Sequence, residues 1–217
     1  MNEVVVNEGA VRPGRPRRFS PDAELQLILD AAMTVMRRAA SADANVTEIL
    51  EEAGLSTRAF YRHFASKDDL LRKMARREAE RAAARLATRV AAVGSTLGKL
   101  EAWVDEMLSF GYDRRKAVRV ALLSSEAAQR AADDSERRRV REAMSAPLVT
   151  VLSFGRGDGT FPSALPDSHA RSIQALVGGL LQASVAGTPV WTTQAEAVAE
   201  VLRFCLPALG ATDHPSD

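Results

Sequence analysis

The stretch "AGLSTRAFYRHFASKDDLL", residues 53–71, gathers a glycine turn, hydroxyl groups, aromatic rings and basic side chains between two helical patterns. The preceding segment, NVTEILEEAG, predicts a short helix that ends at Gly54, because glycine adopts the left-handed backbone conformation at little cost. Ser56 or Thr57 caps a second helix, which runs to about Phe64. Two short helices joined by a glycine-containing turn predict a helix-turn-helix.

The flanking segments are helical as well. Ser20 is a plausible N-cap followed by Pro21, and apolar residues then recur at the 3, 4, 7 spacing of one helical face. Ser66 caps a long charged helix that runs to about Val93. Asn45 or Thr47 caps the helix before the turn.

The pattern stays helical to the end of the chain, with a bend or interruption expected near Pro147 and a long loop over residues 155–167. We expect an all-α protein of about nine helices with no strand. The expected organisation is a flexible basic arm (1–19), a helix-turn-helix domain (20–66), a helical ligand-sensing and dimerisation domain (67–210) and a disordered tail (211–217).

Composition supports a helical protein and restricts its class. Hydrophobic residues make up 46% of the 217 residues and aromatic residues only 5%, so the core is mainly Ala, Leu and Val. The single cysteine excludes an intrachain disulfide and fits a reducing compartment. No apolar run is long enough to cross a bilayer, so we expect a cytoplasmic protein without a membrane partner.

Positive charge is concentrated near the N-terminus, while the chain as a whole is almost neutral. The net charge is +1, yet four arginines and no acid lie between residues 12 and 18. This pattern suggests that the N-terminal end contacts a polyanion, although a solvated surface would look the same.

The second helix of a helix-turn-helix enters the major groove of double-stranded DNA, with short polar side chains at its start and basic residues at its flanks. Phe60 and Phe64 are predicted to be core residues. The predicted DNA-contacting residues are Thr47, Ser56, Thr57, Arg58, Tyr61, His63 and Lys67.

These residues resemble the signature of TetR-family transcriptional repressors. The resemblance extends from Val46 to Leu70 and includes Gly54, Tyr61 and Lys67. It implies a homodimer whose last two helices pack against their symmetry mates as a four-helix bundle. It also implies release from DNA when a small molecule binds the C-terminal domain, whose walls suit an apolar or amphipathic effector.

The arm segment RPGRPRR partly resembles an AT-hook, although Pro13 replaces the first core arginine. Arg15 and Arg17 are candidates for the minor groove of A·T-rich DNA. The alternative is a basic tail with no base preference.

Two apolar sets lie in the C-terminal domain. The candidate dimer interface is Ile173, Leu176, Val177, Leu180, Val198, Val201, Leu202 and Cys205, and the candidate ligand pocket is Trp103, Met107, Phe110, Leu122 and Ser125. Both sets suit an intramolecular core equally well.

Catalysis is disfavoured. The three histidines stand in distant contexts, and no metal-spaced cluster, phosphate-binding glycine loop or nucleophile motif is present. We therefore expect a protein that is not an enzyme and needs no cofactor. Two alternatives stay open, namely a ligand-independent architectural DNA-binding protein and an activator of the same fold.

Overall fold

The computed structural model describes residues 19–39, 41, 44–123 and 134–211, without the side chains of residues 122, 123 and 136. Over these residues the chain forms nine helices and no strand, as predicted. The helices are α1 (Pro21–Ala39), α2 (Val46–Ala53), α3 (Thr57–His63), α4 (Lys67–Ala91), α5 (Thr96–Tyr112), α6 (Arg114–Leu123), α8 (Asp134–Asp158), α9 (Pro166–Val185) and α10 (Gln194–Leu209).

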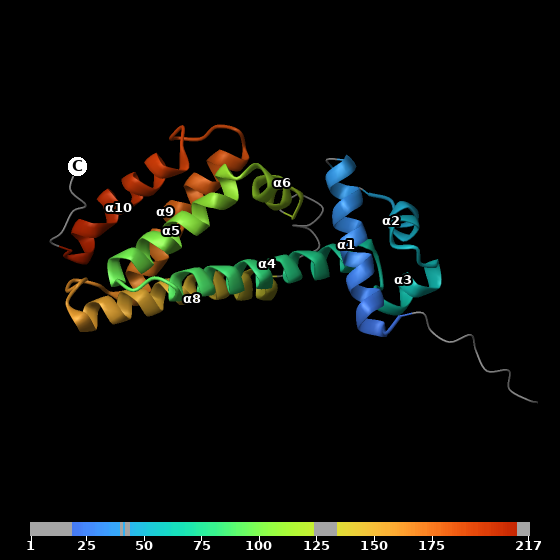
Figure 1. The fold of residues 1–217 in the computed structure, drawn as a ribbon, viewed down its shortest axis with the longest axis horizontal. Helices are drawn as coiled ribbons and strands as arrows, with labels where there is room; N and C mark the ends of the chain where they lie inside the picture. Colours follow the sequence, from blue (N-terminus) through green and yellow to red (C-terminus); the bar gives the residue numbers. More distant parts are fainter. Residues whose placement is uncertain (1–18, 40, 42–43, 124–133, 212–217) are drawn as a thin grey trace, which may run out of the picture.

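The molecule is elongated, with a small head and a larger body (Figure 1). Helices α1, α2 and α3 form the head at one end. Helix α4 runs from the head along the body, where it packs against α8 and α5. Helices α9 and α10 both pack on α5. The long α4 therefore connects the two parts of the molecule.

Nearby residues set the starts of the first four helices and the end of α2, as the sequence predicts. The Ser20 hydroxyl accepts a hydrogen bond from the Ala23 amide, and Asn45 rather than Thr47 caps α2 by accepting from the Thr47 amide at 2.9 Å. Gly54 ends α2 with φ of 63°. Ser56 caps α3 and Ser66 caps α4, each by accepting from a backbone N–H of the first turn.

Two hydrophobic cores hold the fold together. The first contains apolar residues of α1, α2 and α3 together with Leu70, Leu71 and Met74 from the start of α4. The second is built from the remainder of α4 and from α5, α8, α9 and α10. Helix α4 therefore contributes to both cores and joins the head to the body as one continuous helix.

The prediction of a loop over residues 155–167 is wrong for residues 155–158, which are helical. Helix α8 continues to Asp158 and runs through Pro147 without interruption. The turn begins at Gly159, whose φ is 83°. Helix α8 extends through Gly155 because Phe161 folds back onto that glycine, with 0% of its own surface exposed. This tertiary packing overrides the turn tendency of the glycine-rich sequence.

Candidate nucleic-acid interface

Helix α3 presents a polar face to solvent. Thr57, Arg58 and Tyr61 are exposed, and Tyr61 has 66% of its surface accessible. Ala59 and Phe60 lie on the opposite side and are only 3% and 1% exposed. Arg58 and Tyr61 are three positions apart, so their side chains project from the same side of the helix. The predicted core role of Phe60 is confirmed.

The other predicted DNA-contacting residues differ in their setting. Ser56 uses its hydroxyl to accept from the Ala59 amide at 3.4 Å, while Thr47 is exposed at the start of α2. Lys67 is half-buried at the first position of α4. Arg15 and Arg17 lie outside the described residues. The contacts of all these residues with DNA stay predictions.

His63 points toward α1 rather than into solvent. Only 11% of its side chain is exposed, and its Nε2 lies 3.1 Å from Oε2 of Glu24. Arg62 donates from Nη1 to the same oxygen at 2.5 Å. The hydrogen bond from His63, opposed by desolvation and helped by Arg62, holds the pKa of Glu24 below its ordinary value. A phosphate contact by His63 would require exchange of its bond to Glu24.

The candidate ligand residues lie in the second core. Trp103, Met107 and Phe110 are 0%, 7% and 8% exposed, and the indole N–H of Trp103 donates to the Met144 carbonyl at 3.1 Å. The Leu122 side chain and Ser125 lie outside the described part of the chain. The three described residues therefore act as core residues in this structure, and a role in a ligand pocket stays a prediction.

Most candidate dimer residues are buried within the single chain. Seven of the eight, all except Leu176, are no more than 9% exposed. Among the large apolar side chains of α9 and α10, Leu176 is half-buried and Phe204 is 74% exposed. These two residues line an apolar groove of about 60 Å³ between the helices, together with Ile173 and Ala208. The sequence analysis missed Phe204.

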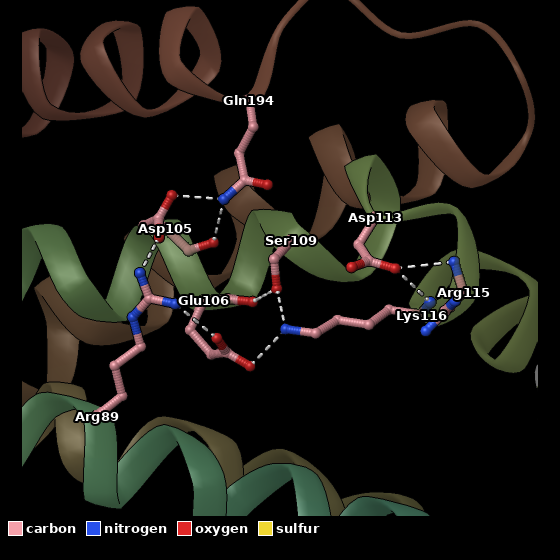
Figure 2. Close-up of polar contacts among 8 residues, drawn as sticks. All are labelled: Arg89, Asp105, Glu106, Ser109, Asp113, Arg115, Lys116 and Gln194. Atoms are coloured by element: carbon pink, nitrogen blue, oxygen red, sulfur yellow. Dashed lines mark hydrogen bonds and ion pairs between the residues drawn. The ribbon is translucent and has the colours of Figure 1, made fainter.

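A polar network ties α5 to three other helices of the body (Figure 2). The Glu106 carboxylate, in a residue only 4% exposed, accepts from Arg89 of α4 at 3.0 Å and from Lys116 of α6 at 2.8 Å. Asp105 accepts from Arg89 and from the side chain of Gln194 at the start of α10. A buried carboxylate is stable only when paired, so these cations fix the positions of α4 and α6 against α5.

A metal site and a membrane-spanning helix each set requirements that can be compared with the described residues. No group of three or more His, Cys, Asp or Glu side chains there is arranged to hold a metal ion. Nor is any helix in the described ranges long and apolar enough to span a membrane.

Comparison with known proteins agrees with this arrangement. Residues 28–74 match the family model described as bacterial regulatory proteins, tetR family. No curated protein sequence matches the chain. The match spans most of the head and the first turns of α4, which are the elements that share the first core.

Solved structures extend the similarity to the body. A TetR-family regulator from Mesorhizobium loti has a TM-score of 0.70 at 15% identity, over 88% of this chain and 97% of that one. A TetR regulator from Haloarcula marismortui has a TM-score of 0.68 at 21% identity, over 86% and 98%. The regulator FadR of Bacillus subtilis, in complex with stearoyl-CoA, has a TM-score of 0.66 at 16% identity, over 84% and 98%.

A helix-turn-helix head on a helical body is the arrangement found in DNA-binding transcription regulators of this family. Residues 28–74 match the model of the tetR family of bacterial regulatory proteins, and the described part of the chain has the fold of TetR-family transcriptional regulators.

Proposed function

We propose that the chain is a homodimeric repressor that binds a palindromic operator and leaves it when a small amphipathic molecule occupies the body. The observation that carries this proposal is the exposed polar face of α3, opposite its buried Phe60 and at one end of an elongated molecule. A helix of this kind fits the major groove, and a two-fold dimer carries two of them to grooves about 34 Å apart.

The exposed side chains divide into two roles. Arg58 is suited to a base edge, since its guanidinium can donate two hydrogen bonds to guanine. Tyr61, Thr47 and Lys67 are suited to phosphates, which fix the register of the head on the duplex. Arg15 and Arg17 would add contacts in the adjacent minor groove.

Variants separate these roles. Arg58→Ala should relax preference at one base pair per half-site, at a cost of about 1–3 kcal/mol. Tyr61→Phe and Lys67→Ala should weaken binding to all duplexes, and loss of the lysine charge should flatten the salt dependence by roughly one phosphate contact per chain. Arg156→Ala removes an exposed charge near the end of α8, far from the head, and serves as the control. Unchanged affinity of the head variants would contradict these assignments.

The outer face of α9 and α10 is the proposed dimer interface. Phe204 is 74% exposed and borders the apolar groove, so the two together form an apolar surface that a second copy of the chain can cover. The more deeply buried members of the predicted set would support the interface from behind. Leu176 and Ala208 offer small apolar surfaces that allow a second helix pair to approach closely.

Sedimentation velocity tests the interface. The wild type should sediment at twice the chain mass of 23.4 kDa, and Phe204→Glu should yield monomers. Phe154→Glu introduces the same charge at another exposed aromatic residue, on α8, and should leave the dimer intact. A dimeric Phe204→Glu variant, or a monomeric wild type, would contradict the interface.

The effector class is proposed from two observations. FadR of Bacillus subtilis, which has the same fold, was crystallised with stearoyl-CoA. In addition, α6 begins with three consecutive basic residues, Arg114, Arg115 and Lys116, against a body with a large apolar core. An amphipathic molecule with an anionic head group, of which a long-chain acyl-CoA is one example, suits both features.

Release of a bound duplex should be measured with stearoyl-CoA, stearate and coenzyme A in parallel. Release by the thioester alone would support an acyl-CoA effector, whereas release by stearate would support a simple fatty acid. If none of the three lowers DNA affinity, this effector class is wrong. DNA binding that no small molecule weakens would favour the architectural alternative.

A further inference from the structure

Glu24 is an acidic residue buried in the head of a protein whose target is a polyanion. It lies in the first turn of α1 and is only 7% exposed. One of its oxygens, Oε2, is within hydrogen-bond distance of both Arg62 and His63, the last two residues of α3. An ionised carboxylate only accepts hydrogen bonds, so Nε2 of His63 carries a proton in this arrangement.

This carboxylate links α1 to the C-terminal end of α3. The other end of α3 is fixed by its Ser56 cap, and its buried face is limited to Ala59 and Phe60. Phe60 and the adjacent Phe64, each 1% exposed, hold one side of α3 in the first core, and the Lys73 ammonium donates to the His63 carbonyl. Arg62 and His63 also bond to Glu24, which lies 38 and 39 positions before them in sequence. These two bonds restrain the orientation of α3 from the neighbouring helix α1.

Rotation of α3 would be costly for recognition. Arg58 and Tyr61 project from the side of α3 that faces solvent, and hydrogen bonds to base edges require placement to within about 0.5 Å and 10–20°. A negative charge in the head otherwise weakens DNA binding. Its bonds to two residues of the recognition helix therefore point to a role in geometry.

We propose that Glu24 is a positioning residue for DNA recognition: through Arg62 and His63 it fixes the orientation of α3, so that Arg58 and Tyr61 meet the groove in register. The proposal rests on the proposed DNA-binding function of α3. It also assigns Arg62 and His63 to this restraint rather than to phosphate contact.

The test compares two affinities of the full-length protein. One duplex is selected by the wild-type protein from a randomised library, and the other is a random duplex of the same length. Both are measured by fluorescence anisotropy for the wild type, Glu24→Gln and Glu52→Gln. Glu52 pairs with the exposed Arg38 elsewhere in the head, so its replacement removes the same charge without touching α3.

If Glu24 positions α3, its replacement by Gln lowers affinity for the selected duplex. If Glu24 acts only as a negative charge, the same replacement raises that affinity. Glu24→Gln should lower affinity for the selected duplex about tenfold, while affinity for the random duplex stays the same or rises. Glu52→Gln should change both affinities alike and keep their ratio. If Glu24→Gln keeps the wild-type ratio, the proposal is overturned, even if the variant has a lower melting temperature.

A second variant covers the case in which Glu24→Gln does not fold. Glu24→Asp keeps the charge but shortens the side chain by one methylene, so it cannot bond both partners equally. It should give an intermediate ratio, and a wild-type ratio would overturn the proposal. If the wild type selects no duplex at all, the proposed function fails rather than the role of Glu24.

Discussion

Arg119 of α6 donates a hydrogen bond at 2.9 Å to the carboxylate of Glu78, a residue of α4 that is only 5% exposed. The adjacent Arg77 pairs with Asp30 of α1 at 2.8 Å. Helix α6 is therefore connected through α4 to the first helix of the head. A ligand that displaced α6 would act on the head through these charges, which is a direct route for the proposed release from DNA.

Arg119→Met should loosen α6 while keeping the apolar stem of the side chain. Glu78 would retain Arg81 at 3.1 Å, so we expect a loss of about 1–3 kcal/mol in the free energy of unfolding. Arg203→Ala breaks an exposed pair within α10 and should cost no more than about 0.5 kcal/mol. Urea unfolding measures both losses. If the two variants lose the same free energy of unfolding, the bond between Arg119 and the buried Glu78 does not stabilise the fold as we expect.

Two glycines of α8 should respond in opposite directions to alanine. A Cβ at Gly155 would lie 2.2 Å from Cδ2 of the buried Phe161, so Gly155→Ala should destabilise the protein by about 1–3 kcal/mol. A Cβ at Gly157 meets nothing within 4 Å, and Gly157→Ala should stabilise α8 by up to about 1 kcal/mol. Thermal unfolding of both variants provides the comparison, and a stable Gly155→Ala variant would refute the packing against Phe161.

Cys205 should be unreactive in the native protein. Burial raises the pKa of its thiol to about 11, and only the thiolate attacks a disulfide reagent. At pH 8 we expect little reaction of the native protein with an aromatic disulfide over the time in which the urea-unfolded chain reacts completely. Rapid modification of the folded protein would show that the helix pair α9 and α10 opens readily.

Asp158 should make the free energy of unfolding depend on pH in the acid range. The Thr96 hydroxyl donates to it at 2.6 Å and the Thr160 amide at 2.8 Å, and these bonds lower the pKa of Asp158 from 3.8. A lowered pKa stabilises the fold above about pH 4, and this contribution is lost as the pH falls through the folded-state value.

The free energy of unfolding of Asp158→Asn should therefore lie below that of the wild type near neutral pH and approach it toward pH 3. In a Thr96→Val background the same replacement should show a weaker pH dependence. A difference that stayed constant from pH 7 to pH 3 would mean that the charge of Asp158 has no part in it.

The sequence predicts the helices well because their ends depend on nearby residues. Ser20, Ser56 and Ser66 cap helices through bonds only three positions long, and Gly54 ends α2 by its own backbone freedom. The end of α8 could not be predicted in the same way. It depends on the packing of Phe161, which is a tertiary contact.

The candidate dimer residues show a second limit of prediction from the sequence. Helical periodicity identifies apolar stripes on α9 and α10, but it cannot tell which stripe faces the chain's own core. Val177 and Val201 face inward, whereas Phe204 faces solvent. The direction that a stripe faces depends on tertiary packing, which the periodicity of one helix does not report.

The buried acids were missed although the sequence carries a signal for them. Glu24 lies four positions before the buried Ile28, Glu78 lies between Met74 and Ala82 at the same spacing, and Glu106 follows Trp103 by three. An acid on the apolar stripe of a helix predicts a buried, paired carboxylate. Its partners cannot be predicted this way, since His63 is 39 positions from Glu24.

The central claim is that α3 reads sequence as part of a symmetric dimer. The most direct measurement is selection of duplexes from a randomised library at about 0.15 M salt, followed by sedimentation of the complex. The account predicts enrichment of an inverted repeat, with half-site centres about 10 base pairs or a multiple apart, bound by an even number of chains. Recovery of no preferred sequence, or of a site without two-fold symmetry bound by one chain, would contradict it.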